Sequence, residues 1–318
     1  MSVHVLSLEE HNAFGVDAVD DLGAAMLTAV AGYGRDVLFV IVSVWIDETG
    51  TGDEPSLMVG GIGASALNWL SFSQQWSALL GNANVPHAHL YKMERNEGPF
   101  SDRTVWGVSR KAAFVSAQLP ILQKWCQFGL TVSLDKHLYR DVYRKDFPAG
   151  TSPDSAYGLA CKELILAVQE HCGRLFNEAD SINFVVEEGH VNMPNAEQIF
   201  RELKLCFPEG AENLGTLFPM SRDDGKPLQA IDHLVVMARR AEPRMLKDDA
   251  FLSYFEEDRL SDMVEKLPDG ETFPVFYHPL TEDRLRWHRE HKAEMSKILR
   301  RIKRARVAKS RSSREQPS

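Results

Sequence analysis

The most constraining feature of this chain is an apolar run that ends abruptly in two acids, residues 38–50, LFVIVSVWIDETG. Eight of its first nine residues are apolar and many are β-branched, which is typical of a strand buried on both faces. Asp47 and Glu48 follow, and the Thr and Gly residues after them supply a turn. A carboxylate at the end of a buried strand is costly unless something compensates for it. The run therefore predicts a central strand that ends either in a solvated loop or at a cation site.

Two later predicted strands end in the same way. Residues 126–134 are followed by Asp135, and residues 182–186 are followed by Glu187 and Glu188. Side chains alternate along a strand, so only one acid of an adjacent pair faces a given side of the sheet. A carboxylate after each of three predicted strands indicates that the strand ends share a role.

Helical periodicity is present between and after these strands. Residues 68–80 and 157–175 carry apolar stripes, and Pro227 opens a further helix. Asp232 lies within the apolar stripe of that helix, where a lone carboxylate is destabilising unless it is paired or bound to metal. Residues 57–64 predict an antiparallel hairpin partner for the first strand. Together these elements predict an α/β fold with a mixed central sheet flanked by helices.

The strand ends suggest a shared site if their strands are parallel neighbours. In that case Asp47, Asp135 and Glu187 converge at one edge of the sheet. Converging carboxylates raise one another's pKa unless a counter-charge is close. Mg²⁺ and Mn²⁺ prefer oxygen ligands and would supply that charge. Two such ions about 4 Å apart activate water and stabilise the leaving oxygen of a phosphodiester, so the pattern predicts a metal-dependent phosphodiesterase.

The same residues resemble the bacterial "domain of unknown function 3800" family, which has a ribonuclease H-like fold. Its Asp-Glu-Ser-Gly start is similar to residues 47–50, where Thr49 stands in place of the usual Ser. Its Glu-x-Gly-His form is similar to residues 187–190, and its Gln-x-x-Asp helix to residues 229–232. The resemblance covers roughly residues 38–240 and implies a three-layer ribonuclease H-like domain.

The resemblance also implies roles for individual residues. Asp47 would bridge the metal ions, Glu187 and Asp232 would complete the metal ligands, and Asp135 would be a fourth catalytic candidate. A polar segment at residues 86–94 adds histidine and lysine side chains to the candidates. The residues expected to support the ligands or to position the substrate are Glu48, His89, Lys92, Glu188, His190 and Gln229.

Charge is distributed unevenly along the chain. The formal net charge is −9, but residues 297–314 contain nine Lys or Arg and no acid. Residues 1–296 therefore carry a net charge of −17. A basic tail on an acidic body suggests that contact with a polyanion such as RNA or DNA begins at the tail, through sequence-independent phosphate contacts. The tail residues expected to make these contacts are Arg300, Arg301, Lys303, Arg304 and Arg306, with a disordered solubilising tail as the alternative.

The sequence predicts four regions in a cytoplasmic protein. They are an N-terminal extension (residues 1–36), a ribonuclease H-like domain (residues 37–245), a helical C-terminal extension (residues 246–296) and a disordered basic tail (residues 297–318). The four cysteines form no CxxC pair, which favours reduced, buried thiols. No apolar run approaches the roughly 18 residues of a membrane span, so no membrane association is expected.

Three functions are compatible with these patterns. The first is a metal-dependent nuclease that acts on RNA or DNA. The second is a non-catalytic binding module of a mobile-element or phage-defence system that has kept the fold, which gains weight because the acidic body repels nucleic acid away from the tail. The third is a hydrolase that uses a carboxylate pair on sugars, for which the sequence contains no supporting motif.

Overall fold

The computed structural model describes most of the chain from residue 41 to residue 312. The described ranges are 41–145, 151–175, 181–189, 192–206, 213–245 and 275–312, together with residues 147 and 149. They belong to one compact unit, Val40–Ser318. The predicted N-terminal extension, residues 246–274 of the predicted C-terminal extension, and His190 lie outside the described residues.

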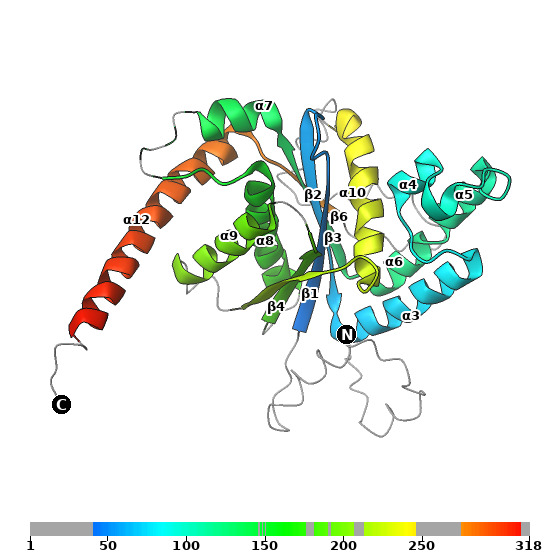
Figure 1. Ribbon diagram of the computed structural model, residues 1–318, viewed down its shortest axis with the longest axis horizontal. Helices are drawn as coiled ribbons and strands as arrows, with labels where there is room; N and C mark the ends of the chain where they lie inside the picture. Colours follow the sequence, from blue (N-terminus) through cyan, green and yellow to red (C-terminus); the bar gives the residue numbers. More distant parts are fainter. Residues whose placement is uncertain are drawn as a thin grey trace, which may run out of the picture. The chain divides into compact units, whose positions relative to one another are not determined.

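Six strands of the described chain form one mixed sheet in the order β5-β4-β1-β2-β3-β6 (Figure 1). Their bounds are β1 (Ile41–Thr49), β2 (Ser56–Ser65), β3 (Phe128–Asp135), β4 (Ser181–Glu187), β5 (Leu214–Met220) and β6 (Val275–Pro279). β2 pairs antiparallel with β1 and with β3. The β1–β4, β4–β5 and β3–β6 pairs are parallel. The predicted mixed sheet is confirmed, and β1 and β4 end at the same edge of it.

β1 lies inside the sheet and is buried on both faces, as the apolar run predicts. Its fully buried side chains include Val42, Val44, Trp45 and Ile46. β2 is the predicted hairpin partner and pairs along almost the whole of β1. The turn between them begins at Gly50, whose φ of +84° lies in the left-handed region that glycine adopts without steric cost. The chain can therefore reverse directly after the acids of β1.

Helices cover both faces of the sheet (Figure 1). One face carries α3 (Ala66–Ala83), α4 (Leu90–Arg95), α5 (Val108–Ser116), α6 (Leu119–Trp125) and α10 (Lys226–Met245). The other face carries α8 (Ala156–Leu175), α9 (Met193–Cys206) and α12 (Glu282–Ser312). The connections contain the short helical segments η1 (Gly98–Phe100), α7 (Lys136–Leu138) and η2 (Tyr139–Arg144). α10 packs on β1 and β2, and α8 packs on β2 and β3, so the sheet is the middle of three layers.

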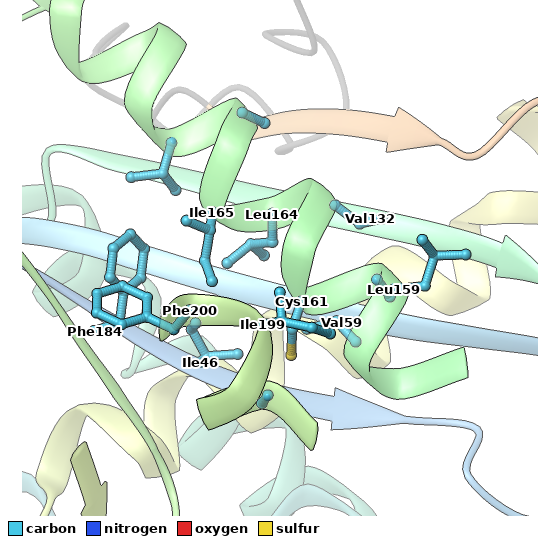
Figure 2. Close-up of a cluster of buried hydrophobic side chains, with 14 of the residues drawn as sticks. Ile46, Val59, Val132, Leu159, Cys161, Leu164, Ile165, Phe184, Ile199 and Phe200 are labelled. Carbon is cyan, nitrogen blue, oxygen red and sulfur yellow. The ribbon is translucent and has the colours of Figure 1, made fainter. Parts of the chain in front are cut away.

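The main hydrophobic core lies between the sheet and the α8–α9 layer (Figure 2). Figure 2 shows Ile46, Val59, Val132 and Phe184 of the strands facing Leu159, Cys161, Leu164 and Ile165 of α8 and Ile199 and Phe200 of α9. The rings of Phe184 and Phe200 pack edge to face, with centroids 5.8 Å apart. Burial of this apolar surface holds the layers together and fixes the positions of the strand ends.

Two predictions about the C-terminal region are corrected by the structure. Residues 275–279, within the predicted helical extension, form β6, because the buried Val275 and Tyr277 alternate with less buried neighbours in a β pattern. Residues 297–312, expected to begin a disordered tail, continue α12. Lys, Arg and Ala favour helix, and a helix that has already formed extends at little cost.

The described residues include the side chains of three of the four cysteines. Cys126 and Cys161 are buried free thiols, and Cys206 is a partly buried one. The side chain of Cys172 lies outside the described residues. Within the described ranges, none of the helices is both long and apolar enough to cross a lipid bilayer.

Candidate functional site

Asp47 is a buried carboxylate near the end of β1. Its residue is only 2 % exposed, and Oδ1 accepts a hydrogen bond from the backbone N–H of Glu48 at 2.9 Å. Burial raises the pKa of Asp47 well above its ordinary value, and neighbouring acids raise it further against the opposing charge of Arg222. Positive charge close to this carboxylate is therefore required to keep it ionised.

Glu187 is the last residue of β4 and lies beside Asp47. The parallel register pairs Ile46 with Val186, so the next residue of each strand falls at the same level of the sheet. The Glu187 side chain is 31 % exposed and is more open to solvent than that of Asp47. Glu188 is exposed, and its N–H donates to the carbonyl of Met220 at 2.9 Å.

Asp232 comes to the same place from α10. It is 6 % exposed, and its Oδ2 accepts a hydrogen bond from the N–H of Leu90 at 2.8 Å and lies 3.3 Å from Nδ1 of His89. Burial alone would raise the pKa of Asp232, but the adjacent imidazole of His89 and the charge of Arg222 outweigh it and lower the pKa. Asp232 is therefore held in its ionised form by groups from α4 and the loop before α10.

Gln229, one turn before Asp232, organises the backbone around the site. Its Oε1 accepts hydrogen bonds from the indole N–H of Trp76 at 3.1 Å and from the N–H of Ala88 at 3.0 Å. Its Nε2 donates to the carbonyl of Arg222 at 3.1 Å. Gln229 and Asp232 together hold the backbone of residues 88 and 90, so that His89 faces Asp232.

Arg222 lies at the centre of the carboxylates and was not among the residues predicted from sequence. Its Nη2 is 2.9 Å from Oδ2 of Asp47 and 2.5 Å from Oε2 of Glu187. Its Nη1 is 3.7 Å from Oδ1 of Asp232. Burial opposes the charged form of Arg222, but the three acids outweigh it and raise its pKa. The sequence contained an electrostatic clue to Arg222. Converging acids require a cation, and Arg222 lies in the polar segment that precedes α10.

Glu48 occupies the opposite face of β1 because side chains alternate along the strand. Burial raises the pKa of Glu48 to about 7, and the charge of Glu187 adds to the shift. Burial raises the pKa of Tyr157 and of Cys161, and the charge of Glu48 adds to both shifts, which places Glu48 near α8. Glu48 is therefore part of the electrostatics of the site although it faces the other layer.

Two other predicted site residues, Asp135 and Lys92, are described by the structure, whereas His190 is outside the described residues. Asp135 ends β3, and β2 lies between β3 and β1, so the two strands are not the parallel neighbours that the predicted convergence requires. Asp135 is exposed and caps α7, accepting hydrogen bonds from the N–H groups of His137 at 2.6 Å and Leu138 at 3.0 Å. Lys92 is half-buried on α4. Burial is the main cause that lowers the pKa of His87, and the positive charge of Lys92 lowers it further.

The carboxylate oxygens of this site can be compared with the ligands that a divalent cation requires. Within the described ranges, no three Cys, His, Asp or Glu side chains are arranged as ready ligands of a metal ion. Arg222 stands among the acids and accounts for their spacing. Three carboxylates and one guanidinium nevertheless carry a formal charge of −2 in a largely buried place. These oxygen donors and this surplus charge suit Mg²⁺ or Mn²⁺ if the guanidinium moves.

Comparisons of the chain with known proteins identified no relative. Neither a protein-family model, nor a curated protein, nor a solved structure matches it. The function is therefore inferred from the geometry of the site and from the sequence resemblance.

Proposed function

We propose that this protein is a divalent-metal-dependent nuclease that hydrolyses phosphodiester bonds of RNA or DNA. The observation that carries this proposal is the meeting of the Asp47, Glu187 and Asp232 carboxylates around one guanidinium. These acids come from two neighbouring strand ends and a packed helix, so rigid elements hold them in place. Their surplus negative charge favours a hard divalent cation.

Asp47, Glu187 and Asp232 would hold Mg²⁺ or Mn²⁺, which when bound supplies an activated water and stabilises the leaving oxygen of a phosphodiester. The residues of the chain orient these ligands. The N–H of Glu48 fixes one oxygen of Asp47, and the N–H of Leu90 fixes one oxygen of Asp232. His89 contacts the same oxygen of Asp232 and restricts its rotation.

The fold and the sequence motifs support this proposal at a coarser level. A mixed sheet between two helical layers is what the resemblance to the "domain of unknown function 3800" family implies. The ribonuclease H-like identity of the domain is part of the proposal. Asp135, which the resemblance adds as a fourth carboxylate, caps α7, and we assign it to that role rather than to the metal ligands.

The basic end of α12 supports nucleic acid as the substrate. Arg300, Arg301, Lys303 and Arg304 are exposed there, whereas the side chain of Arg306 lies outside the described residues. Such a cluster binds phosphates without regard to sequence. It would compensate for the repulsion between a polyanion and the acidic body of the protein.

Thermal unfolding in the presence of metal tests the cation site. Millimolar Mg²⁺ or Mn²⁺ should raise the Tm of the wild-type protein, because a ligand of the folded state stabilises it. Asp47→Asn and Asp232→Asn should abolish this increase. Asp135→Asn is the matched control, because Asn also caps helices and the increase should remain. A wild-type Tm that does not respond to either metal would contradict the proposal.

Cleavage of labelled RNA and DNA tests the activity. Cleavage should require Mg²⁺ or Mn²⁺ and should be lost in Asp47→Asn and Asp232→Asn. Cleavage that survives both substitutions would originate from another site or from a contaminant. The substrate that is cut faster identifies the class of nucleic acid.

One observation favours a second function. Arg222 already neutralises part of the charge of the three acids, so the cluster can also serve as a permanent ion-pair network. The protein would then be a non-catalytic ribonuclease H-like binding module of a mobile-element or phage-defence system. In that case nucleic acid would bind without being cleaved, and Asp47→Asn would leave the binding affinity unchanged.

A further inference from the structure

Arg222 combines a fixed backbone with a partly exposed side chain. Its carbonyl accepts a hydrogen bond from Gln229 at 3.1 Å. In the same turn, the N–H of Gly225 donates to the carbonyl of Ser221 at 2.9 Å. The Arg222 side chain keeps 15 % of its surface exposed, and the side chain of its partner Glu187 is 31 % exposed. A backbone held by these hydrogen bonds and a side chain that reaches solvent favour rotation of the guanidinium over movement of the loop.

The guanidinium uses little of its donor capacity. Nη2 donates to Asp47 and to Glu187, whereas Nε and Nη1 are buried and have no hydrogen-bond partner in the part of the chain that the structure describes. The 3.7 Å between Nη1 and Asp232 allows attraction between charges but is too long for a hydrogen bond. Permanent Arg–carboxylate pairs are frequently bidentate, with two parallel N–H donors. Arg222 thus holds the acids through a single nitrogen, Nη2, and through its positive charge, and another cation can replace that charge.

We propose that Arg222 is an exchangeable counter-ion of this carboxylate site and that a divalent cation displaces it. The inference rests on the proposed metal-dependent function. A guanidinium and a divalent ion within a few ångströms of each other repel strongly where solvent is largely excluded, so both cannot remain among the same three acids. Arg222 therefore neutralises part of the charge of the acids without metal, lowers the affinity for metal, and rotates toward solvent when metal binds.

Calorimetric titration with MnCl₂ tests this exchange in the full-length protein. Arg222→Gln should bind Mn²⁺ about ten-fold more tightly than the wild type, because the competing charge has been removed. In EDTA its Tm should be lower than that of the wild type, and saturating Mn²⁺ should restore it. Arg239→Gln is the matched control: Arg239 lies at the same edge of the sheet, with Nη1 3.6 Å from Glu54, and its removal should change the affinity less than about three-fold.

The outcomes separate this inference from the proposed function. Mn²⁺ binding by the wild type with equal or weaker binding by Arg222→Gln would overturn the exchange and leave the metal site in place. No Mn²⁺ binding by the wild type would overturn both. If Arg222→Gln does not fold, the arginine Nε–Hε signal of the wild type, assigned by its loss in Arg222→Lys, provides the test. Saturating Mg²⁺ should shift this signal and speed its exchange with solvent, and an unchanged signal would overturn the proposal.

Discussion

Gly60 lies opposite Asp47 in the β1–β2 ladder, on the surface where α10 packs against the sheet. A Cβ atom at Gly60 would lie 2.3 Å from Cγ1 of Val235, which no packed structure tolerates. Val235 is one turn beyond Asp232 on the same helix. The missing side chain therefore lets α10 approach the sheet closely enough for Asp232 to join Asp47 around Arg222.

Gly60→Ala should accordingly separate α10 from the sheet. We expect the free energy of unfolding to fall by about 1–3 kcal/mol, the usual cost of overpacking a core, and the metal-dependent increase in Tm to shrink as Asp232 moves away. Urea denaturation and thermal unfolding with Mn²⁺ measure the two effects. Gly81→Ala is the control, since nothing lies within 4 Å of a Cβ there and alanine should stabilise α3 by about 0.5–1 kcal/mol. Equal effects of the two substitutions would contradict this account.

The sequence predicts the pairing of acids where local pattern and strand direction are sufficient. Asp47 and Glu187 each follow a mostly apolar strand, and both strands point the same way in adjacent positions, so the structure brings the acids together. Asp232 was recognisable because a carboxylate within an apolar helical stripe requires a partner. Asp135 satisfied the same local pattern, but strand order depends on long-range pairing, and β2 separates its strand from β1.

Arg222 could not be identified from local pattern, because it belongs to a short polar loop without periodicity. Its place among the acids depends on α10 and on the hydrogen bond from Gln229 to its carbonyl, both of which are tertiary features. β6 was missed for a related reason. Its five residues follow a proline-rich segment and pair with β3, which is about 145 residues away in the sequence. The hydrogen bond from Thr131 of β3 to the carbonyl of Phe276 spans this separation.

Glu48 should make stability depend on pH between about 4.5 and 7. Its pKa is raised from 4.5 to about 7 by burial and by Glu187, so the folded state favours the protonated form. The stability that the protein gains from keeping Glu48 protonated is therefore fully present below about pH 4.5 and is lost as the pH rises through 7. In EDTA at pH 8, Glu48→Gln should raise the free energy of unfolding by up to about 3 kcal/mol, a gain that disappears toward pH 4.5. Urea denaturation at a series of pH values measures this difference.

Glu97→Gln provides the control for this pH series. Its side chain is 51 % exposed, and its ion-pair distance to Arg95 is 4.0 Å, so its removal should change stability by less than about 0.5 kcal/mol at any pH. A wild-type pH dependence that matches that of Glu48→Gln would show that Glu48 does not carry the effect.

Glu163 of α8 should have the opposite pH dependence, and it anchors α12. Its carboxylate accepts hydrogen bonds from Nε of Arg284 at 2.9 Å and from Nε2 of His288 at 2.7 Å. Burial alone would raise the pKa of Glu163, but the partners on α12 outweigh it and lower the pKa to about 2. The stabilisation is therefore present above about pH 4.5 and is lost as the pH falls through 2.

Glu163→Gln should lower the free energy of unfolding by about 3 kcal/mol at pH 7, with a smaller loss at pH 3. Denaturation in urea at the two pH values measures this change. Glu282→Gln is the control, because Glu282 is 50 % exposed and pairs with Arg286 within α12, an ion pair worth about 0.5 kcal/mol at most. A loss that is the same at pH 3 and pH 7 would indicate a packing defect instead of the missing charge.

The exposed basic residues of α12 should determine the salt dependence of nucleic-acid binding. Replacing Arg300, Arg301, Lys303 and Arg304 with Gln keeps a residue of similar helix propensity and removes four positive charges. The affinity for single-stranded DNA should fall, and the slope of log K against log salt should become shallower by about 0.7 for each phosphate that the protein no longer neutralises. Fluorescence anisotropy at several salt concentrations measures both. Replacing the three arginines with Lys keeps the charge and should keep the slope, so an unchanged slope in the Gln variant would place the phosphate-binding residues on another surface.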